Sequence, residues 1–188
     1  MKLGSVIFYK NIPSFLSWVQ RFVLKTKYSH LSICRGKDSL GLTLELEANI
    51  QVDTTTYHPD NEHRDVYEFI DTPEQVIKTV LIQIIHDYEE KTYGFISWLT
   101  IFIRRIFELL GFDAKGWNIL WGWGIHCSEL GFYYLMKIAV IMLNTPEKEL
   151  YELWLQFKMD LEDYNPNLFT PPDAQYLMAK HYKLFRKV

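Results

Sequence analysis

The sequence predicts an α+β fold, because segments with the period of strands come first and segments with the period of helices follow. Alternating apolar and polar residues occur at 28–34, 39–50 and 65–70, and longer apolar stretches with helical spacing fill much of the rest. Of the 188 residues, 48% are apolar and 16% are aromatic, so the chain can bury a large core. We therefore expect a single domain over residues 1–188, in which a small antiparallel sheet packs against a buried helix and a helical elaboration occupies about 73–110.

The first part of the chain predicts a strand, a helix and a β-hairpin. Residues 4–9 read as a short buried strand, and residues 12–24 have apolar side chains at helical spacing, with Pro13 early in the helix. The runs 28–34 and 39–50 both alternate between apolar and polar residues. Because the polar stretch RGKD separates these two runs, we expect them to pair as a hairpin.

The remaining elements are mostly helical. A polar loop at 53–65 leads into a further alternating strand at 65–70. A helix is expected from Pro73 onward, with Asp71 or Thr72 as its N-cap. The later segments are a helix at 94–110, an irregular stretch at 111–124, helices at 127–143 and 145–157, a turn with a short helix at 165–177 and a last strand within 181–188.

Charge and cysteine content argue against two classes of protein. The formal net charge is −3 with both signs interspersed, unlike the basic stripe of a nucleic-acid-binding protein, so no nucleic-acid partner is expected. Two cysteines, Cys34 and Cys127, are too few for a typical secreted disulfide scaffold and favour a reducing compartment. The N-terminus lacks a signal-peptide layout, so the cytoplasm is the default expectation, with association with a phage or virus particle as a further hypothesis.

Two apolar stretches are interrupted by charge. Arg104 and Arg105 divide 94–112, and Lys137 divides 130–143, so neither reaches the roughly 18 apolar residues of a membrane-spanning helix. We expect both to be buried helices. A second hypothesis for 94–112 is contact with a membrane surface or an apolar partner, because aromatic residues and paired arginines suit that environment.

Cys127 lies in the segment GIHCSEL, directly before an apolar run that predicts a buried helix. Ser128 and Glu129 are typical of a first helical turn, so Cys127 lies at or next to the N-cap. Unpaired N–H groups and the positive end of the helix dipole favour a thiolate there and could hold an oxyanion. The alternative is an inert buried thiol.

A nucleophilic cysteine needs a general base, and His30 is the best-placed histidine. It lies in a predicted strand, which fixes a side chain more firmly than the loop that holds His58 and His63. His126 adjoins Cys127, but neighbouring residues at a helix start rarely point at each other, so we expect only a local effect from it. The alternative for His30 is a position on the solvated face of an edge strand.

The group that orients the histidine is expected on the neighbouring strand. The face that bears His30 can also bear Glu45 and Glu47, and the period of two places both glutamates on one side. Spacing alone does not choose between them, and both could simply form the solvated side of the sheet.

The sequence contains only weak indications of a metal site and no motif for a phosphate-bearing cofactor. His58 and His63, with Asp60 and Glu62, form a small cluster that lacks the spacing of a zinc motif. Phosphate-binding loops of the Walker and dinucleotide types do not occur in the sequence. We therefore expect neither a metal nor a cofactor.

Four short motifs occur in an order that resembles a known family. They are YSH at 28–30, LEA at 46–48, CSEL at 127–130 and TPPDA at 170–174. Together they are similar to the circularly permuted NlpC/P60 papain-like hydrolases, in the YiiX-like branch. The resemblance spans most of the chain, loosely over about 71–120. It implies a permuted papain-like fold in which the histidine precedes the cysteine.

The resemblance also implies roles for individual residues. Cys127 corresponds to the nucleophile, His30 to the base, and Glu47, which precedes Ala48, to the orienting residue. Gly131 is a departure, because a larger apolar residue commonly stands in that position of the family.

The expected function is hydrolysis of an amide or ester bond through a thioester acyl-enzyme. The resemblance suggests cell-wall peptides or lipid and other acyl groups as substrates. The alternative is a non-catalytic module of the same fold that binds an apolar ligand or partner through Trp117, Trp121 and Trp123.

Overall fold

The α+β prediction is confirmed. The computed structural model describes residues 1–10, 18, 21–22, 25–48, 52–56, 64–89, 91, 95–112, 125–145 and 148–188. Within these ranges six strands form one sheet in the order β4-β3-β2-β1-β5-β6, and each neighbouring pair is antiparallel. The elements are β1 (Val6–Lys10), β2 (Tyr28–Lys37), β3 (Thr43–Ala48), β4 (Val52–Thr56), β5 (Arg64–Phe69), α2 (Glu74–Tyr88), α3 (Phe95–Leu109), α4 (Cys127–Leu143), α5 (Lys148–Glu162), η1 (Pro166–Leu168), α6 (Pro171–Lys180) and β6 (Phe185–Lys187).

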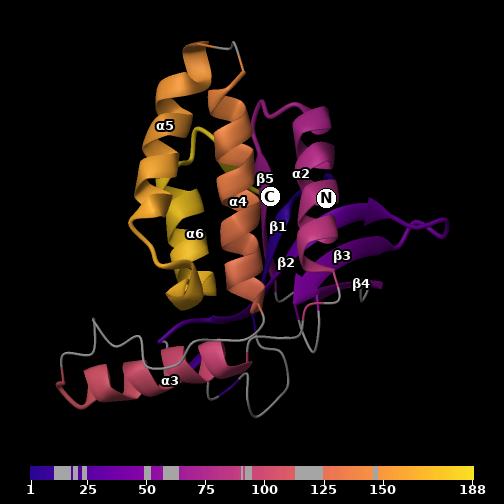
Figure 1. Cartoon of the computed structure of the whole chain (residues 1–188). Coiled ribbons are helices and arrows are strands. Elements are labelled where there is room, and N and C mark those ends of the chain that lie inside the picture. Colours follow the sequence, from indigo (N-terminus) through magenta and orange to yellow (C-terminus); the bar gives the residue numbers. More distant parts are fainter. Residues whose placement is uncertain are drawn as a thin grey trace.

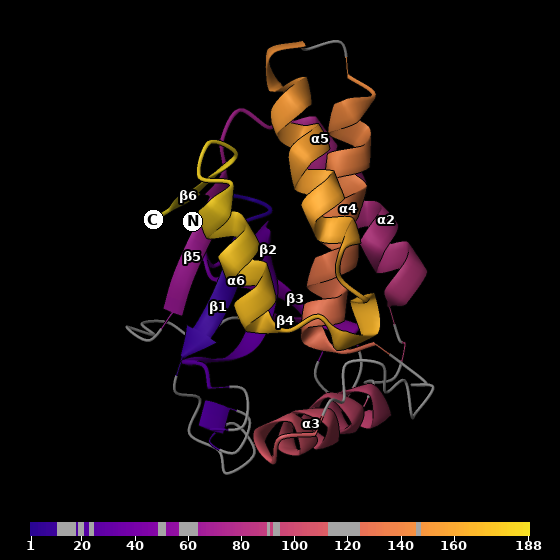
Figure 2. The same ribbon diagram turned by 90° about the vertical axis from the view of Figure 1, so that its left-hand side faces the viewer.

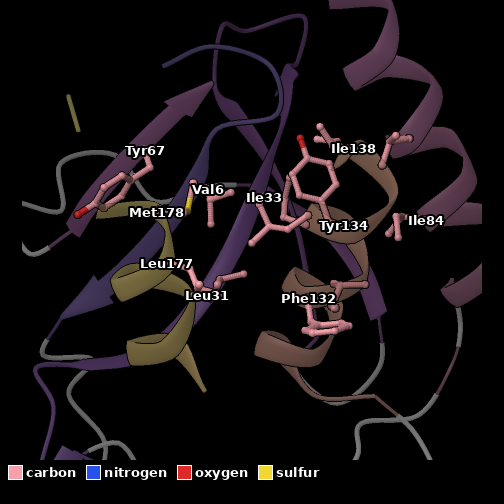
Figure 3. Packing of buried hydrophobic residues seen from close by; sticks show 14 of the residues in the cluster. Val6, Leu31, Ile33, Tyr67, Ile84, Phe132, Tyr134, Ile138, Leu177 and Met178 are labelled. Atoms are coloured by element: carbon pink, nitrogen blue, oxygen red, sulfur yellow. The ribbon is translucent and has the colours of Figure 1, made fainter. Parts of the chain in front are cut away.

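The helices form a layer on one face of the sheet. Helices α4 and α6 pack against β2, while α2 and α5 pack against α4 (Figures 1 and 2). Helix α4 is apolar on nearly every side, which is why it lies at the centre of this layer. The main core forms where Leu31 and Ile33 of β2 meet Phe132, Tyr134 and Ile138 of α4 (Figure 3).

Gly131 allows α4 to approach β2 closely. A Cβ atom at this position would lie 2.9 Å from Cδ2 of Leu31, closer than ordinary packing permits. The first turn of α4 therefore rests against the strand that carries His30. This packing gives a physical reason for a glycine where the resemblance leads one to expect a larger residue.

Helix α3 lies apart from this layer, at the end of the molecule where α4 begins (Figures 1 and 2). It contacts the short helix η1, which precedes α6. Within the described ranges, no helix combines the length and the apolar character needed to cross a bilayer.

The hairpin between β2 and β3 differs from its prediction in two ways. Its turn lies at 38–42 rather than at RGKD, and the register shifts between Cys34 and Gly36. Gly36 has a φ of 126° at this irregularity, a conformation that side chains disfavour. Because of the shift, even-numbered residues of β2 before the bulge share a face with odd-numbered residues of β3. His30 therefore shares its face with Glu45 and Glu47.

Two local predictions were wrong. Strand β4 occupies the beginning of the predicted polar loop 53–65, since its threonines pair with β3 although they give no apolar alternation. The N-cap of α2 is Pro73 without a side-chain hydrogen bond, so neither Asp71 nor Thr72 caps this helix. The Thr72 hydroxyl instead donates to the carbonyl of Ile70 at 3.5 Å.

Several predictions lie outside the described residues. These are most of the helix expected at 12–24, the histidine and acidic cluster at 57–63, and the glycine- and tryptophan-rich stretch from 113 to 124.

Replacement of Gly131 by valine is predicted to destabilise the protein by about 1–3 kcal/mol, because the new side chain overpacks against Leu31. Urea unfolding would measure the loss. The combined variant Gly131→Val/Leu31→Ala should be more stable than the sum of the two single effects predicts. Strict additivity would show that the two positions do not compete for space.

Candidate active site

His30 and Glu47 form a direct hydrogen-bonded pair. Nε2 of His30 lies 2.7 Å from Oε2 of Glu47, and the two side chains are only 12% and 15% exposed. The strand register explains the contact: Ile33 pairs with Leu46, which puts Glu47 beside Ser32 and diagonal to His30. Side chains in diagonal positions on neighbouring strands are within reach of each other.

Glu45 is held elsewhere on the same face of the sheet. The hydroxyl of Tyr9 donates to Oε2 of Glu45 at 2.6 Å, and the Ser32 hydroxyl donates to the same oxygen. These bonds direct the Glu45 carboxylate toward β1. Of the two candidate glutamates, it is therefore Glu47 that contacts His30.

Cys127 is the first residue of α4 and is only 4% exposed. His126 is the N-cap: its Nδ1 accepts the N–H of Glu129 at 3.2 Å, and its own N–H donates to Oε2 of Glu129 at 3.4 Å. This reciprocal capping box fixes the start of the helix. The effect of His126 on its own helix turn is local, as expected, but the capping role itself was not predicted, because histidine is not among the usual N-cap residues.

Three groups near Cys127 favour the ionised form of its sulfur, through charge or hydrogen bonding. They are the imidazole of His30, the backbone N–H of Leu31 and the backbone N–H of Ser128. Since Glu47 engages Nε2 of His30, Nδ1 is the ring nitrogen left to face the sulfur. The ladder pairs between β2 and β3 start at Ile33, so Leu31 lies outside this ladder and its N–H is available to the sulfur.

These contacts shift both pKa values toward a charged pair. Burial opposes ionisation of Cys127, but the charge and hydrogen bond of His30 and the two N–H groups hold the pKa of the thiol below its usual range. Burial likewise opposes the imidazolium, but the Cys127 sulfur and then Glu47 raise the pKa of His30 well above its usual range. The arrangement therefore favours a thiolate–imidazolium pair near neutral pH.

The other cysteine has the properties of an inert thiol. Cys34 is buried among Ile7, Tyr9 and Val66, and burial raises the pKa of its thiol. The surroundings of Cys34 therefore favour the neutral thiol, whereas those of Cys127 favour the thiolate.

A cavity of about 520 Å³ lies between α3 and the segment that joins α5 to α6. Its lining is Ile101, Arg104, Arg105, Glu108, Asp163, Tyr164, Asn165, Leu168, Thr170, Pro172 and Asp173. Asn167, in the same segment, accepts a hydrogen bond from Nε2 of His126 at 3.4 Å. The cavity therefore adjoins the start of α4.

In the part of the chain that the structure describes, no group of three His, Cys, Asp or Glu residues is arranged to hold a metal ion. The cluster around His58 and His63 lies outside that part.

Comparison with known proteins does not place the chain in a family. No protein-family model matches the sequence, and no curated protein matches it.

The charged pair predicts that Cys127 reacts with iodoacetamide well below pH 8, because its thiolate persists below the usual thiol pKa. In His30→Ala the pKa of Cys127 should rise, so alkylation should require a higher pH. Mass spectrometry of the alkylated peptide would separate Cys127 from Cys34, the internal control with a raised pKa. An alkylation profile of Cys127 that is the same with and without His30 would contradict the pairing.

Proposed function

We propose that the protein is a cysteine hydrolase with a permuted papain-like arrangement, which cleaves an amide or ester bond through a thioester. One observation carries the proposal. A sulfur at the start of a buried helix contacts an imidazole that a carboxylate from the next strand holds in place. Nucleophile, general base and a group that orients the base are the three parts used in nucleophilic catalysis by cysteine.

The first half of the reaction forms the acyl-enzyme. The Cys127 thiolate attacks the carbonyl carbon of the substrate, and the negative charge moves to the carbonyl oxygen. The N–H of Cys127 is the proposed donor to that oxygen, because first-turn N–H groups have no acceptor within the helix. Protonated His30 then gives its proton to the leaving amine or alkoxide as the carbon–heteroatom bond breaks and the thioester remains.

The second half of the reaction restores the enzyme. Neutral His30 takes a proton from water, the resulting hydroxide attacks the thioester carbon, and the carbon–sulfur bond breaks to release a carboxylic acid product. The sulfur leaves as the thiolate, which again pairs with the His30 imidazolium. Glu47 stabilises that cation and fixes the ring orientation throughout.

The surroundings of the site favour an acyl substrate presented at a membrane surface. The polar residues of α3, Arg104, Arg105 and Glu108, line the cavity beside the start of α4. Positions 102, 106 and 109 lie on another face of this helix, turned away from the cavity. Leu109, Leu110 and Phe112 at the end of α3 are 45%, 67% and 58% exposed. A helix of this kind is suited to lie in a bilayer surface.

The two glutamates provide a matched test of the catalytic role. Glu47→Gln retains the size of the side chain but removes the charge that stabilises the imidazolium, so kcat should fall on the order of 100-fold. Glu45→Gln removes the same charge on the same face, and its kcat should stay within about threefold of the parent value. Hydrolysis of p-nitrophenyl butyrate would be the assay, with Cys127→Ala as the inactive reference. If Glu45→Gln alone loses activity, the assignment of Glu47 is wrong.

The surface orientation of α3 predicts binding to phosphatidylcholine vesicles. Leu110→Asp/Phe112→Asp should weaken co-sedimentation about tenfold or more, because charge replaces two exposed apolar side chains. Ile82→Asp is the matched control, because Ile82 is 68% exposed but lies on α2. Equal losses in both variants, or no vesicle binding by the parent protein, would contradict this orientation.

A further inference from the structure

The N-cap of α4 is a histidine with both ring nitrogens engaged. Nδ1 accepts from the N–H of Glu129 and from the hydroxyl of Ser128, each at 3.2 Å, while Nε2 lies 3.4 Å from the carbonyl oxygen of Asn167. A carbonyl oxygen can only accept, so Nε2 carries the ring proton, and Nδ1 must be bare to accept. This pattern fits the neutral Nε2–H tautomer alone.

The surroundings keep this ring neutral. His126 is only 2% exposed, and burial lowers its pKa to about 4. The Glu129 carboxylate on the same helix lies near the ring, with its Oε2 3.9 Å from Nε2. Burial raises the pKa of Glu129 to about 7, while the backbone N–H of His126 and the charge of Lys91, which follows α2, act in the opposite direction. The first turn of α4 is thus capped without a full charge on the cap.

We propose that His126 is a positioning residue for Cys127, which holds the first turn of α4 with a neutral acceptor and ties that turn to the segment beside the cavity. This inference rests on the proposed function, because it concerns the residue assigned as the nucleophile. His126 itself does not contact the substrate in this account. It acts through the backbone on either side of the sulfur.

A neutral N-cap has an electrostatic advantage next to Cys127. The common N-cap residues include aspartate, which would satisfy the same N–H of Glu129. An aspartate directly before Cys127 would however place a negative charge beside a sulfur that must itself become negative, and would raise the pKa of the thiol. A neutral imidazole accepts the hydrogen bond without that opposition. Its second nitrogen also reaches η1, which a shorter side chain cannot do.

The link to η1 gives the cap a second role. Asn167 lies between Asn165 and Leu168, which line the cavity. The hydrogen bond from His126 therefore fixes one wall of the cavity relative to the nucleophile. A substitution that loses this bond should alter substrate binding even if the new side chain still accepts the N–H of Glu129.

Three substitutions at one position separate these roles. His126→Asn keeps a neutral cap, so the apparent pKa of Cys127 in iodoacetamide alkylation should stay close to the parent value, while KM for p-nitrophenyl butyrate rises several-fold. His126→Asp keeps the cap but adds charge, and should raise the apparent pKa of the thiol by about one. His126→Ala loses the cap, and its alkylation at pH 6 should slow about fivefold.

His181→Asn is the control. His181 is also a hydrogen-bonded histidine, but it is the C-cap of α6, far from the start of α4, and it pairs with Asp160 of α5. Its alkylation profile should match that of the parent protein. The Asn and Asp variants both keep a cap, so their comparison stays informative if His126→Ala unfolds. Identical thiol pKa values in the Asn and Asp variants would overturn the inference and leave the proposed hydrolase intact. A parent Cys127 that does not react below pH 8 would instead overturn the proposed function itself.

Discussion

The contact between the sulfur of Cys127 and the imidazole of His30 is the interaction on which the rest of the site depends. Cys127 is buried and the side chain of His30 is only 12% exposed, and this loss of solvent alone would leave both groups neutral. The negative charge of Cys127 and the positive charge of His30 stabilise each other. The N–H groups of Leu31 and Ser128 further stabilise the thiolate, and the Glu47 carboxylate stabilises the imidazolium. A buried charge pair is stable only when such additional hydrogen bonds are present.

Three structural details bring the pair together. The β-bulge before Gly36 turns Glu47 onto the face that carries His30. Gly131 lets the first turn of α4 lie against Leu31, the residue that follows His30. His126 caps that turn, so that the N–H of Glu129 is satisfied by the cap and the N–H of Ser128 remains for the sulfur. Each detail acts on backbone position, and the chemistry follows from where the backbone places the side chains.

The sequence predicts the elements that carry Cys127 and His30. The apolar run after Glu129, interrupted only by Lys137, predicts a buried helix, and the predicted range, 127–143, agrees with the structure. The position of His30 in a strand follows from the alternation around it. Helix α3 and strand β5 likewise lie close to their predicted ranges, because their apolar patterns are long or regular.

Other features depend on contacts that are distant in sequence. The choice between Glu45 and Glu47 requires the register of the hairpin, and the bulge that sets it has no signal beyond one glycine. The second hydrogen bond of His126, from Nε2 to the carbonyl of Asn167, joins residues 41 positions apart, so the local sequence around GIHCSEL does not show it. Strand β4 is polar because it lies at the edge of the sheet, where pairing with β3 outweighs weak alternation.

The most direct measurement is the NMR titration of the His30 imidazole in the parent protein and in Cys127→Ala. If the thiolate and the imidazolium stabilise each other, the pKa of His30 is high in the parent protein and falls toward its usual value of about 6.5 when the sulfur is removed. A pKa of His30 that is the same in both proteins would show that the two groups do not interact, and the account of the site would then be wrong.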